Sequence, residues 1–336
     1  MSEIVEEKSI NNLKQQKLNS AALLFRIKKF FKKNPGDILF ENTTRFFAFV
    51  VLSVTFLMAY TMIQQSMPSI KAFGWKFLST TEWDPVTDVY GSLTFVFGTL
   101  YTSFIALLIS IPLSIGVAIF LAEIAPKWLE QPISILVELL AAIPSIVYGL
   151  FGIFVMVPWL RETVEPFLSE KLDFLPFFEG APYGFGILAA SLILSIMILP
   201  IITSISRDIM KSIPDSQREA AYALGATKWE VTKIVLSGSK SGILGAALLG
   251  LGRAVGETMA VTMVIGNRAE ISWSLFDPGH TMASVIANEF TEATTNLYLS
   301  SLIEIALLLF VITIILNSIA RFIVWRVTKK FKPVTT

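Results

Sequence analysis

The 336-residue chain contains no cysteine and a single histidine, His280. The absence of cysteine excludes disulfides, thiolate nucleophiles and zinc–thiolate sites. One histidine leaves little for a histidine metal site or a histidine general base, so we predict no metal site and no catalytic residue. Charged residues are also scarce, at 16% against roughly 25% in soluble domains. The net charge of +1 argues against a nucleic-acid-binding protein.

A motif for binding ATP is missing as well. No Gly-x-x-x-x-Gly-Lys-[Ser/Thr] sequence occurs, and the Gly-Ser-Lys-Ser-Gly of residues 238–242 lacks the spacing of a P-loop. We interpret 238–242 as an interfacial turn. If ATP drives this protein, the ATPase is therefore a separate chain, and the chain by itself is not predicted to be an enzyme.

Long apolar runs dominate what is present, and hydrophobic residues make up 54% of the chain. A helix needs about 20 apolar residues to cross a bilayer. Six runs meet this condition, so we predict an all-α integral membrane protein with six transmembrane helices. The runs are 46–64, 93–121, 133–160, a stretch between 179 and 207, 242–266 and 297–320. Pro144 is expected to kink the third helix.

The distribution of basic residues predicts the orientation. Nine lie in residues 1–45, six between the fourth and fifth runs, and five after the sixth run. Both termini should therefore be cytoplasmic. Within the basic N-terminal segment, 21–33 is either an amphipathic helix on the anionic inner leaflet or a plain positive flank. The remaining divisions are an external connection at 65–91, a membrane core at 92–322 and a cytoplasmic tail at 323–336.

The cytoplasmic connection between the fourth and fifth runs carries the strongest local signal. Ser216 and Glu219 have the spacing of a capping box, and Gly225 is placed to end the helix that follows. Thr227 and Glu230 repeat the capping-box spacing and start a second helix. The pattern predicts a helix–glycine–helix elbow. It is either a docking element for a partner or an ordinary interfacial helical hairpin.

Two opposite charges, Arg253 and Glu257, interrupt the fifth run. Their i, i+4 spacing places both on one face of a helix. An arginine near mid-bilayer costs about 2.5–3.5 kcal/mol, so the pair should face the bundle interior or a water-filled path. One interpretation is a structural ion pair. The other is an anion site, because guanidinium binds phosphate oxygens bidentately and the carboxylate can accept a hydrogen bond from monohydrogen phosphate but not from sulfate.

Two polar residues of the third run are weaker candidates for the same path. Ser145 follows Pro144, where a kink frees a carbonyl, although simple packing explains it equally well. Glu138 is expected nearer the cytoplasmic end, where a structural or gating role is more usual than a ligand role. Thr258 directly follows Glu257 and is included with them.

The elbow sequence resembles a known element. Glu219, Ala220, Ala221, Gly225 and Thr227 resemble the EAA loop of type I ABC-transporter permeases, which have the MetI-like fold. The resemblance implies that residues 209–238 form a coupling loop that sits in a cleft of the ATP-binding subunit. The family pattern usually ends in Leu-Pro, whereas this chain has Leu-Ser at 236–237.

A second resemblance concerns the substrate. The segments 253–258 (Arg-Ala-Val-Gly-Glu-Thr), 138–149 and 83–99 resemble phosphate-specific permease subunits, and the long N-terminal segment is similar to the PstC type. This implies a bacterial inner-membrane, multi-pass subunit paired with a PstA-type permease. Two PstB-type subunits would use ATP and Mg, a PstS-type protein would deliver phosphate from outside, and this chain would hold no cofactor. The implied substrate path contains Arg253, Glu257, Thr258, Ser145 and Glu138.

The sequence therefore predicts the permease subunit of an ATP-driven importer that moves inorganic phosphate by alternating access. One alternative is a permease of the same fold for another oxyanion such as sulfate or molybdate. A second is a secondary transporter driven by an ion gradient, although no inverted repeat is evident. An intramembrane enzyme is a third, but the chain offers it little reactive chemistry.

Overall fold

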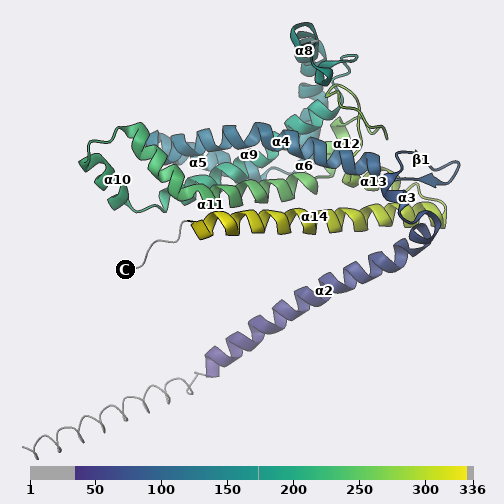
Figure 1. Ribbon diagram of the computed structural model, residues 1–336, viewed down its shortest axis with the longest axis horizontal. Helices are drawn as coiled ribbons and strands as arrows, with labels where there is room; N and C mark the ends of the chain where they lie inside the picture. The colour runs from purple at the N-terminus through teal and green to yellow at the C-terminus, as the bar shows by residue number, and fades with distance from the viewer. Residues whose placement is uncertain (1–34, 173, 331–336) are drawn as a thin grey trace, which may run out of the picture. The chain divides into compact units, whose positions relative to one another are not determined.

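The computed structural model describes residues 35–172 and 174–330 (Figure 1). The chain divides into two compact units, Met1–Thr61 and Met62–Thr336. The expected basic segment 1–45 therefore lies mostly outside the described residues. The interpretation of 21–33 lies wholly outside them, as do residues 331–336 of the expected tail.

Six helices in the described part of the chain are long and apolar enough to cross a membrane, which confirms the predicted number. Five are built on single long helices: α2 (Pro35–Phe73), α4 (Leu93–Ile119), α9 (Ile187–Lys211), α11 (Lys228–Val255) and α14 (Asn296–Lys330). The π-helical turn η1 (Phe120–Ile124) extends α4. The remaining span is composite and consists of α6 (Ser145–Phe151), η2 (Gly152–Met156), α7 (Val157–Trp159), η3 (Leu160–Val164) and α8 (Glu165–Leu172).

The third predicted span, 133–160, is wrong in its bounds. Helix α5 (Lys127–Ala142) ends before Pro144, and the composite span begins only at Ser145. Ile143 has an extended backbone with ψ 130°, because the ring of a proline disfavours helical geometry in the residue before it. Pro144 therefore separates two helices where a kink in one was expected.

The first and fifth spans also differ from their predictions. Helix α2 extends past 46–64 in both directions, so residues 65–73 of the expected external connection are helical. Helix α11 starts at Lys228 and runs unbroken through 238–242, where a turn was expected. It ends at Val255 because Gly256 leaves the helical conformation, and the short helix α12 (Met259–Val264) follows.

Helix α9 forms the centre of the bundle. In its most apolar 18-residue window 72% of the residues are buried, whereas the other five spans reach at most 33%. Helices α4 and α11 lie along it, and α14 runs beside α11 (Figure 1). The Ser114 hydroxyl of α4 donates a hydrogen bond of 3.1 Å to the Leu199 carbonyl of α9. Small hydroxyl residues between membrane helices allow this kind of close polar contact.

The end of the bundle opposite α10 (Asp215–Ala223) is closed by short elements around one carboxylate. They are α3 (Lys76–Ser79), the antiparallel strands β1 (Trp83–Asp84) and β2 (Val89–Tyr90), and α13 (Met282–Glu289). The separate 3-10 helix η4 (Pro176–Phe178) contacts Leu275, whose amide donates a hydrogen bond of 2.8 Å to the Phe177 carbonyl. Glu289 accepts hydrogen bonds of 2.7 Å from both the Trp83 indole and the Tyr298 hydroxyl. These bonds fasten the strand pair to α13 and α14.

Candidate functional site

The elbow forms at the junction of α10 and α11. Gly225 has φ +84°, a left-handed conformation that glycine adopts without strain. The Ala226 amide donates to the Ala221 carbonyl at 3.1 Å, and the Gly225 amide donates to the Tyr222 carbonyl at 2.9 Å. This pair of bonds is a Schellman motif. The predicted helix–glycine–helix elbow is thus present, and Gly225 ends α10 as expected.

One of the two predicted capping boxes is confirmed. The Thr227 amide donates to the Glu230 carboxylate at 2.8 Å, and the Glu230 amide donates back to the Thr227 hydroxyl at 3.4 Å. The other prediction is wrong, because Pro214 occupies the N-cap of α10 and no side chain caps that end. Ser216 and Glu219 lie inside the helix, since α10 begins at Asp215, two residues earlier than their spacing assumed.

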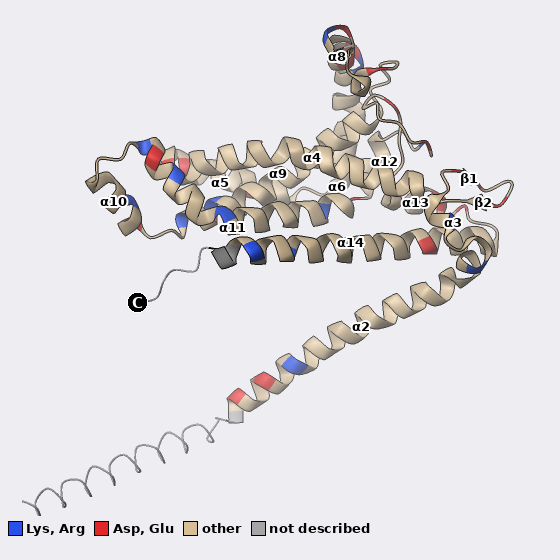
Figure 2. Cartoon of the chain, in the orientation of Figure 1, with Lys and Arg blue, Asp and Glu red and all other residues tan. Residues whose placement is uncertain are grey.

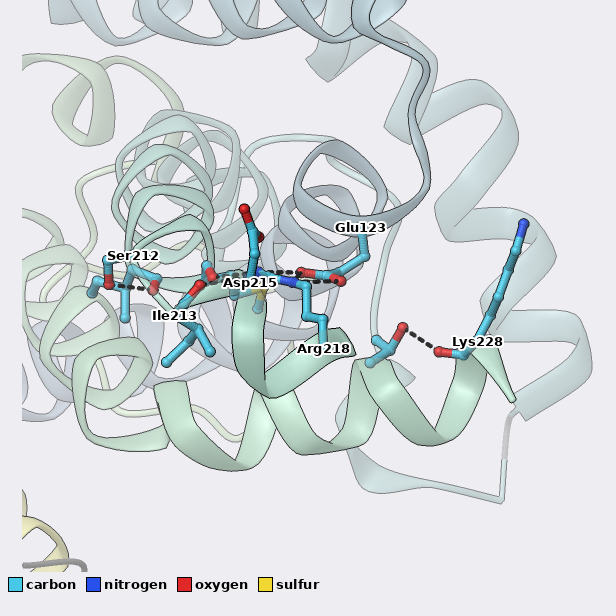
Figure 3. A network of polar contacts seen from close by, with 9 residues as sticks. Glu123, Ser212, Ile213, Asp215, Arg218 and Lys228 are labelled. Atoms are coloured by element: carbon cyan, nitrogen blue, oxygen red, sulfur yellow. Dashed lines mark hydrogen bonds and ion pairs between the residues drawn. The ribbon is translucent and has the colours of Figure 1, made fainter. Parts of the chain in front are cut away.

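Arg218 fastens the elbow to the bundle (Figure 3). Its guanidinium lies 2.9 Å from the Glu123 carboxylate and 3.1 Å from Asp215. It also donates to the Met210 carbonyl in the last turn of α9 at 2.9 Å and to the Ile213 carbonyl, two residues past the end of α9, at 2.5 Å. Hydrogen bonding to Glu123 raises the pKa of Arg218 above its ordinary value, although burial opposes this. Three segments thus meet at one permanently charged side chain.

The outer face of the elbow exposes large apolar side chains among polar ones. Leu224 is 90% exposed and Trp229 is 62% exposed, and Tyr222 beside them is half-exposed. Of the predicted coupling residues, Ala221 is buried, whereas the others are exposed: Glu219, Ala220, Gly225 and Thr227. Large apolar side chains held on a rigid polar-anchored turn form a surface suited to a groove on another protein.

The prediction that Arg253 and Glu257 lie on one face of a helix is wrong. Because α11 ends at Val255, the two residues do not share one helical face, and no ion pair joins them in the described part of the chain. Arg253 is exposed in the last turn of α11, whereas Glu257 is 8% exposed. The Glu257 carboxylate accepts a 3.4 Å hydrogen bond from the Ala260 amide at the start of α12. Thr258, half-buried, is the N-cap residue of α12.

Helix α6 contributes a further polar group beside the break at Pro144. The Tyr148 hydroxyl donates a hydrogen bond of 2.8 Å to the Leu140 carbonyl. That carbonyl also accepts a 3.3 Å hydrogen bond from the Ile143 amide, because Pro144 has no N–H to donate to it. Ser145 is half-buried in the first turn of the same helix, and α6 packs on α12. The broken α5–α6 and α11–α12 segments therefore adjoin, and they carry Ser145, Arg253, Glu257 and Thr258.

Glu138 belongs to a different cluster. It lies 3.1 Å from Arg207 of α9, which also contacts Asp208 at 2.8 Å. Nearby, Lys211 of α9 pairs with Glu130 of α5. These residues line an open groove of about 380 Å³. Glu138 is therefore an interhelix ion-pair partner towards the α10 end of the bundle, where charged residues gather, while the middle is largely uncharged (Figure 2).

Sequence reasoning missed Arg207 and Arg218, which the structure makes the most connected charges. A signal existed for Arg207, since Arg207 and Lys211 are one turn apart on α9 and Glu130 and Glu138 are two turns apart on α5. No local signal joins Arg218 to Glu123.

The comparisons with known proteins agree with this geometry. Residues 114–329 match the family described as "Binding-protein-dependent transport system inner membrane component". The chain is 47% identical over 296 residues to "Phosphate transport system permease protein PstC" of Mesorhizobium japonicum, covering 87% of this chain and 90% of that protein. It is 46% identical over 299 residues to the protein of the same name in Pasteurella multocida, covering 88% and 93%.

A solved structure shares the fold at low identity. It is titled "Crystal structure of a bacterial ABC transporter involved in the import of the acidic polysaccharide alginate". The TM-score is 0.55 at 18% identity, with 85% of this chain and 99% of that chain covered. The helices therefore adopt the MetI-like permease fold that the elbow motif implied.

Proposed function

The chain belongs to the family of binding-protein-dependent transport system inner membrane components, and from this premise we propose that it is a permease subunit that carries inorganic phosphate inward. The observation that carries the proposal is the elbow, a turn that exposes large apolar side chains, is closed by the Schellman motif at Gly225 and is anchored by Arg218. The names of the relatives support phosphate as the substrate.

The elbow is proposed to receive movement from a separate ATPase. ATP with Mg²⁺ belongs to two PstB-type subunits, and a PstA-type permease completes the membrane channel. An external PstS-type protein delivers the substrate. The bond between Arg218 and Glu123 passes a displacement of α10 directly to η1 and α4, while α11 extends unbroken from the elbow to Arg253. Movement of the elbow therefore reorients both segments together and alternates access to the path.

The proposed path runs past the adjoining breaks at Pro144 and Gly256. Arg253 supplies a charge with no carboxylate within ion-pair distance among the described residues. Its guanidinium would hold two phosphate oxygens. Glu257, Thr258 and Ser145 complete the lining. Glu138 is assigned to the closing of the α10 end, because it already pairs with Arg207.

The orientation is part of the proposal. The basic residues of α10 and its neighbours favour the cytoplasm for the end that carries the elbow. The strand pair β1–β2, α8 and α13 then face outward, where a binding protein docks.

Uptake of radiolabelled phosphate and sulfate by proteoliposomes that hold the assembled complex tests the proposal. Phosphate should enter only with ATP inside. Arg253→Gln should reduce uptake by about tenfold to a hundredfold, because a hydrogen bond to a charged group is lost. Glu257→Gln should narrow the preference for phosphate over sulfate. Arg268→Gln, which alters an exposed arginine paired with Glu270, is the matched control.

Other outcomes point to other functions. Preferential uptake of sulfate or molybdate would assign the same fold to another oxyanion. Uptake driven by an ion gradient without the ATPase subunits would identify a secondary transporter.

A further inference from the structure

A groove between α11 and α14 lies outside every site described above. It has a volume of about 360 Å³, within the range of about 300–1,000 Å³ typical of ligand sites. Eight residues line it: Gly245, Leu248, Leu249, Asn317, Ala320, Arg321, Val324 and Trp325. The two helices run antiparallel here, so the C-terminal turns of α14 lie beside the middle of α11.

The lining is apolar along most of its length. Leu249 is 60% exposed, and a Cβ placed on Gly245 would meet no atom within 4 Å. Among the residues that the structure describes, the side chains therefore leave an open trough. Covering this apolar surface lowers the free energy only when the occupant is itself apolar, as an acyl chain is.

The α14 wall of the trough carries a cation midway along its length, because Arg321 lies between Asn317 and Trp325. Arg321 is exposed and has no carboxylate within ion-pair distance in the described ranges 35–172 and 174–330. Asn317 lies one turn earlier on the same face of α14 and adds an amide that can donate hydrogen bonds. Arginine and amide groups together suit a phosphate ester. The trough thus combines an apolar wall on α11 with a wall on α14 that carries the cation and the amide.

The position of Arg321 along α14 matches the headgroup level. It follows Asn296 by 25 residues, about 37 Å of helix, which exceeds the roughly 30 Å hydrocarbon core. Trp325 follows one turn later, and tryptophan and arginine are both typical of the membrane interface.

We propose that this groove binds one anionic phospholipid, with an acyl chain along Leu248 and Leu249 and the headgroup phosphate on Arg321 and Asn317. Free phosphate would gain nothing from the apolar wall, whereas a lipid uses both parts. The lipid site does not depend on which substrate is transported. Lipid retention tests the site and phosphate uptake tests the proposed function, so either proposal can fail without the other.

Native mass spectrometry of the assembled complex, released from nanodiscs of phosphatidylglycerol and phosphatidylcholine, tests the site. The parent complex should retain phosphatidylglycerol preferentially. Arg321→Gln should lower this retention about fivefold, the contribution of one basic residue near an anionic surface. Leu249→Trp, at an exposed position, should fill the trough and reduce retention of both lipids. This second variant decides the matter if Arg321→Gln does not assemble.

Arg326→Gln is the matched control. It removes the same charge at the residue after the lining residue Trp325, where the guanidinium lies over the Phe322 ring and outside the lining, and it should leave retention unchanged. Equal losses in Arg321→Gln and Arg326→Gln would overturn the proposal in favour of general surface attraction. Displacement of the lipid by excess inorganic phosphate, or a parent complex without retained lipid because a partner helix fills the groove, would overturn it as well.

Discussion

Arg218 of α10 and Glu123 of η1, 95 residues apart in the sequence, lie 2.9 Å from each other with 15% and 9% of their side chains exposed. A nearly buried pair of this kind holds its partners in one geometry, because either charge left alone would be strongly unfavourable. The elbow is therefore not a loose loop between two spans. It is a fixed projection of the bundle, and this allows force on α10 to reach α4.

Arg218→Gln should separate ATP hydrolysis from transport. The substitution leaves Glu123 buried without its cation, which costs about 3–5 kcal/mol, so α10 detaches from η1. We expect phosphate uptake to fall at least about tenfold, while the purified complex still hydrolyses ATP. The ratio of phosphate transported to ATP hydrolysed, measured in proteoliposomes, checks this.

Two further variants give this experiment its controls. Asp215→Asn changes the other carboxylate on Arg218, but Asp215 is 89% exposed, so uptake should stay near the parent value. The exchanged pair Glu123→Arg with Arg218→Glu should recover part of the coupling. An unchanged transport ratio in Arg218→Gln would show that the ion pair does not transmit movement.

Thr227→Ala should loosen the first turn of α11. The confirmed capping box disappears, and helix stability falls by about 0.5–2 kcal/mol. Hydrogen exchange at the amides of Lys228 to Val231 should quicken accordingly. Ser216→Ala is the matched control, because Ser216 has a similar expected role but caps nothing in the structure. Equal effects of the two substitutions would contradict the assignment of the cap.

The contrast between these two positions shows what local sequence can predict. Gly225, Thr227 and Glu230 lie within six residues, and the hydrogen bonds that form the turn and the cap join neighbours in the sequence. The turn at Gly225 and the second capping box were therefore predictable. Six apolar runs were predictable for the same reason, since a membrane imposes the length of each helix. The break at Pro144 was also locally encoded, because the residue before a proline avoids helical geometry.

Other features depend on contacts that no short window contains. Arg218 finds Glu123 only when α9 and α4 lie side by side, and Arg207 finds Glu138 only when α5 folds back on α9. The Arg253–Glu257 face was misjudged because the apolar run continues past Gly256. Hydrophobicity alone does not reveal that the helix ends there.

His280 should make stability fall in mild acid. Its ring is 3% exposed, lies 2.7 Å from the Ser284 hydroxyl, and burial lowers its pKa from 6.5 to about 4. Between these values the unfolded chain binds the proton and the folded chain does not. Titration of His280 therefore leaves the free energy of unfolding unchanged above about pH 6.5 and lowers it as the pH falls to about 4.

Thermal unfolding of the purified complex at pH 7 and pH 4.5 measures this decline. His280→Asn removes the titrating group, so its unfolding midpoint should change less between the two pH values than that of the parent. Because every other titratable group is common to both proteins, the difference between their changes in unfolding midpoint isolates the contribution of His280. Parallel pH dependence of the two proteins would contradict the lowered pKa.

Neutralising Arg207 should lower the free energy of unfolding much more than neutralising Glu138, although the two residues form one ion pair. The Arg207 side chain is 10% exposed and has a second partner in Asp208, whereas Glu138 is 59% exposed. Arg207→Gln removes both charge-assisted hydrogen bonds of the cluster but leaves no carboxylate buried, so we expect a loss of about 1.5–3 kcal/mol in stability. Glu138→Gln leaves Arg207 paired with Asp208 and should change stability by less than about 1 kcal/mol.

Transport separates the two roles proposed for Glu138. If it closes the α10 end by holding α5 against α9, Glu138→Gln should keep the preference for phosphate over sulfate and alter only the rate of uptake. Glu257→Gln, at the break between α11 and α12, serves as the comparison and should alter the preference instead. A changed ion preference in Glu138→Gln would return this carboxylate to the substrate path, because a group that only fastens two helices has no means of distinguishing a protonated oxyanion from a fully ionised one.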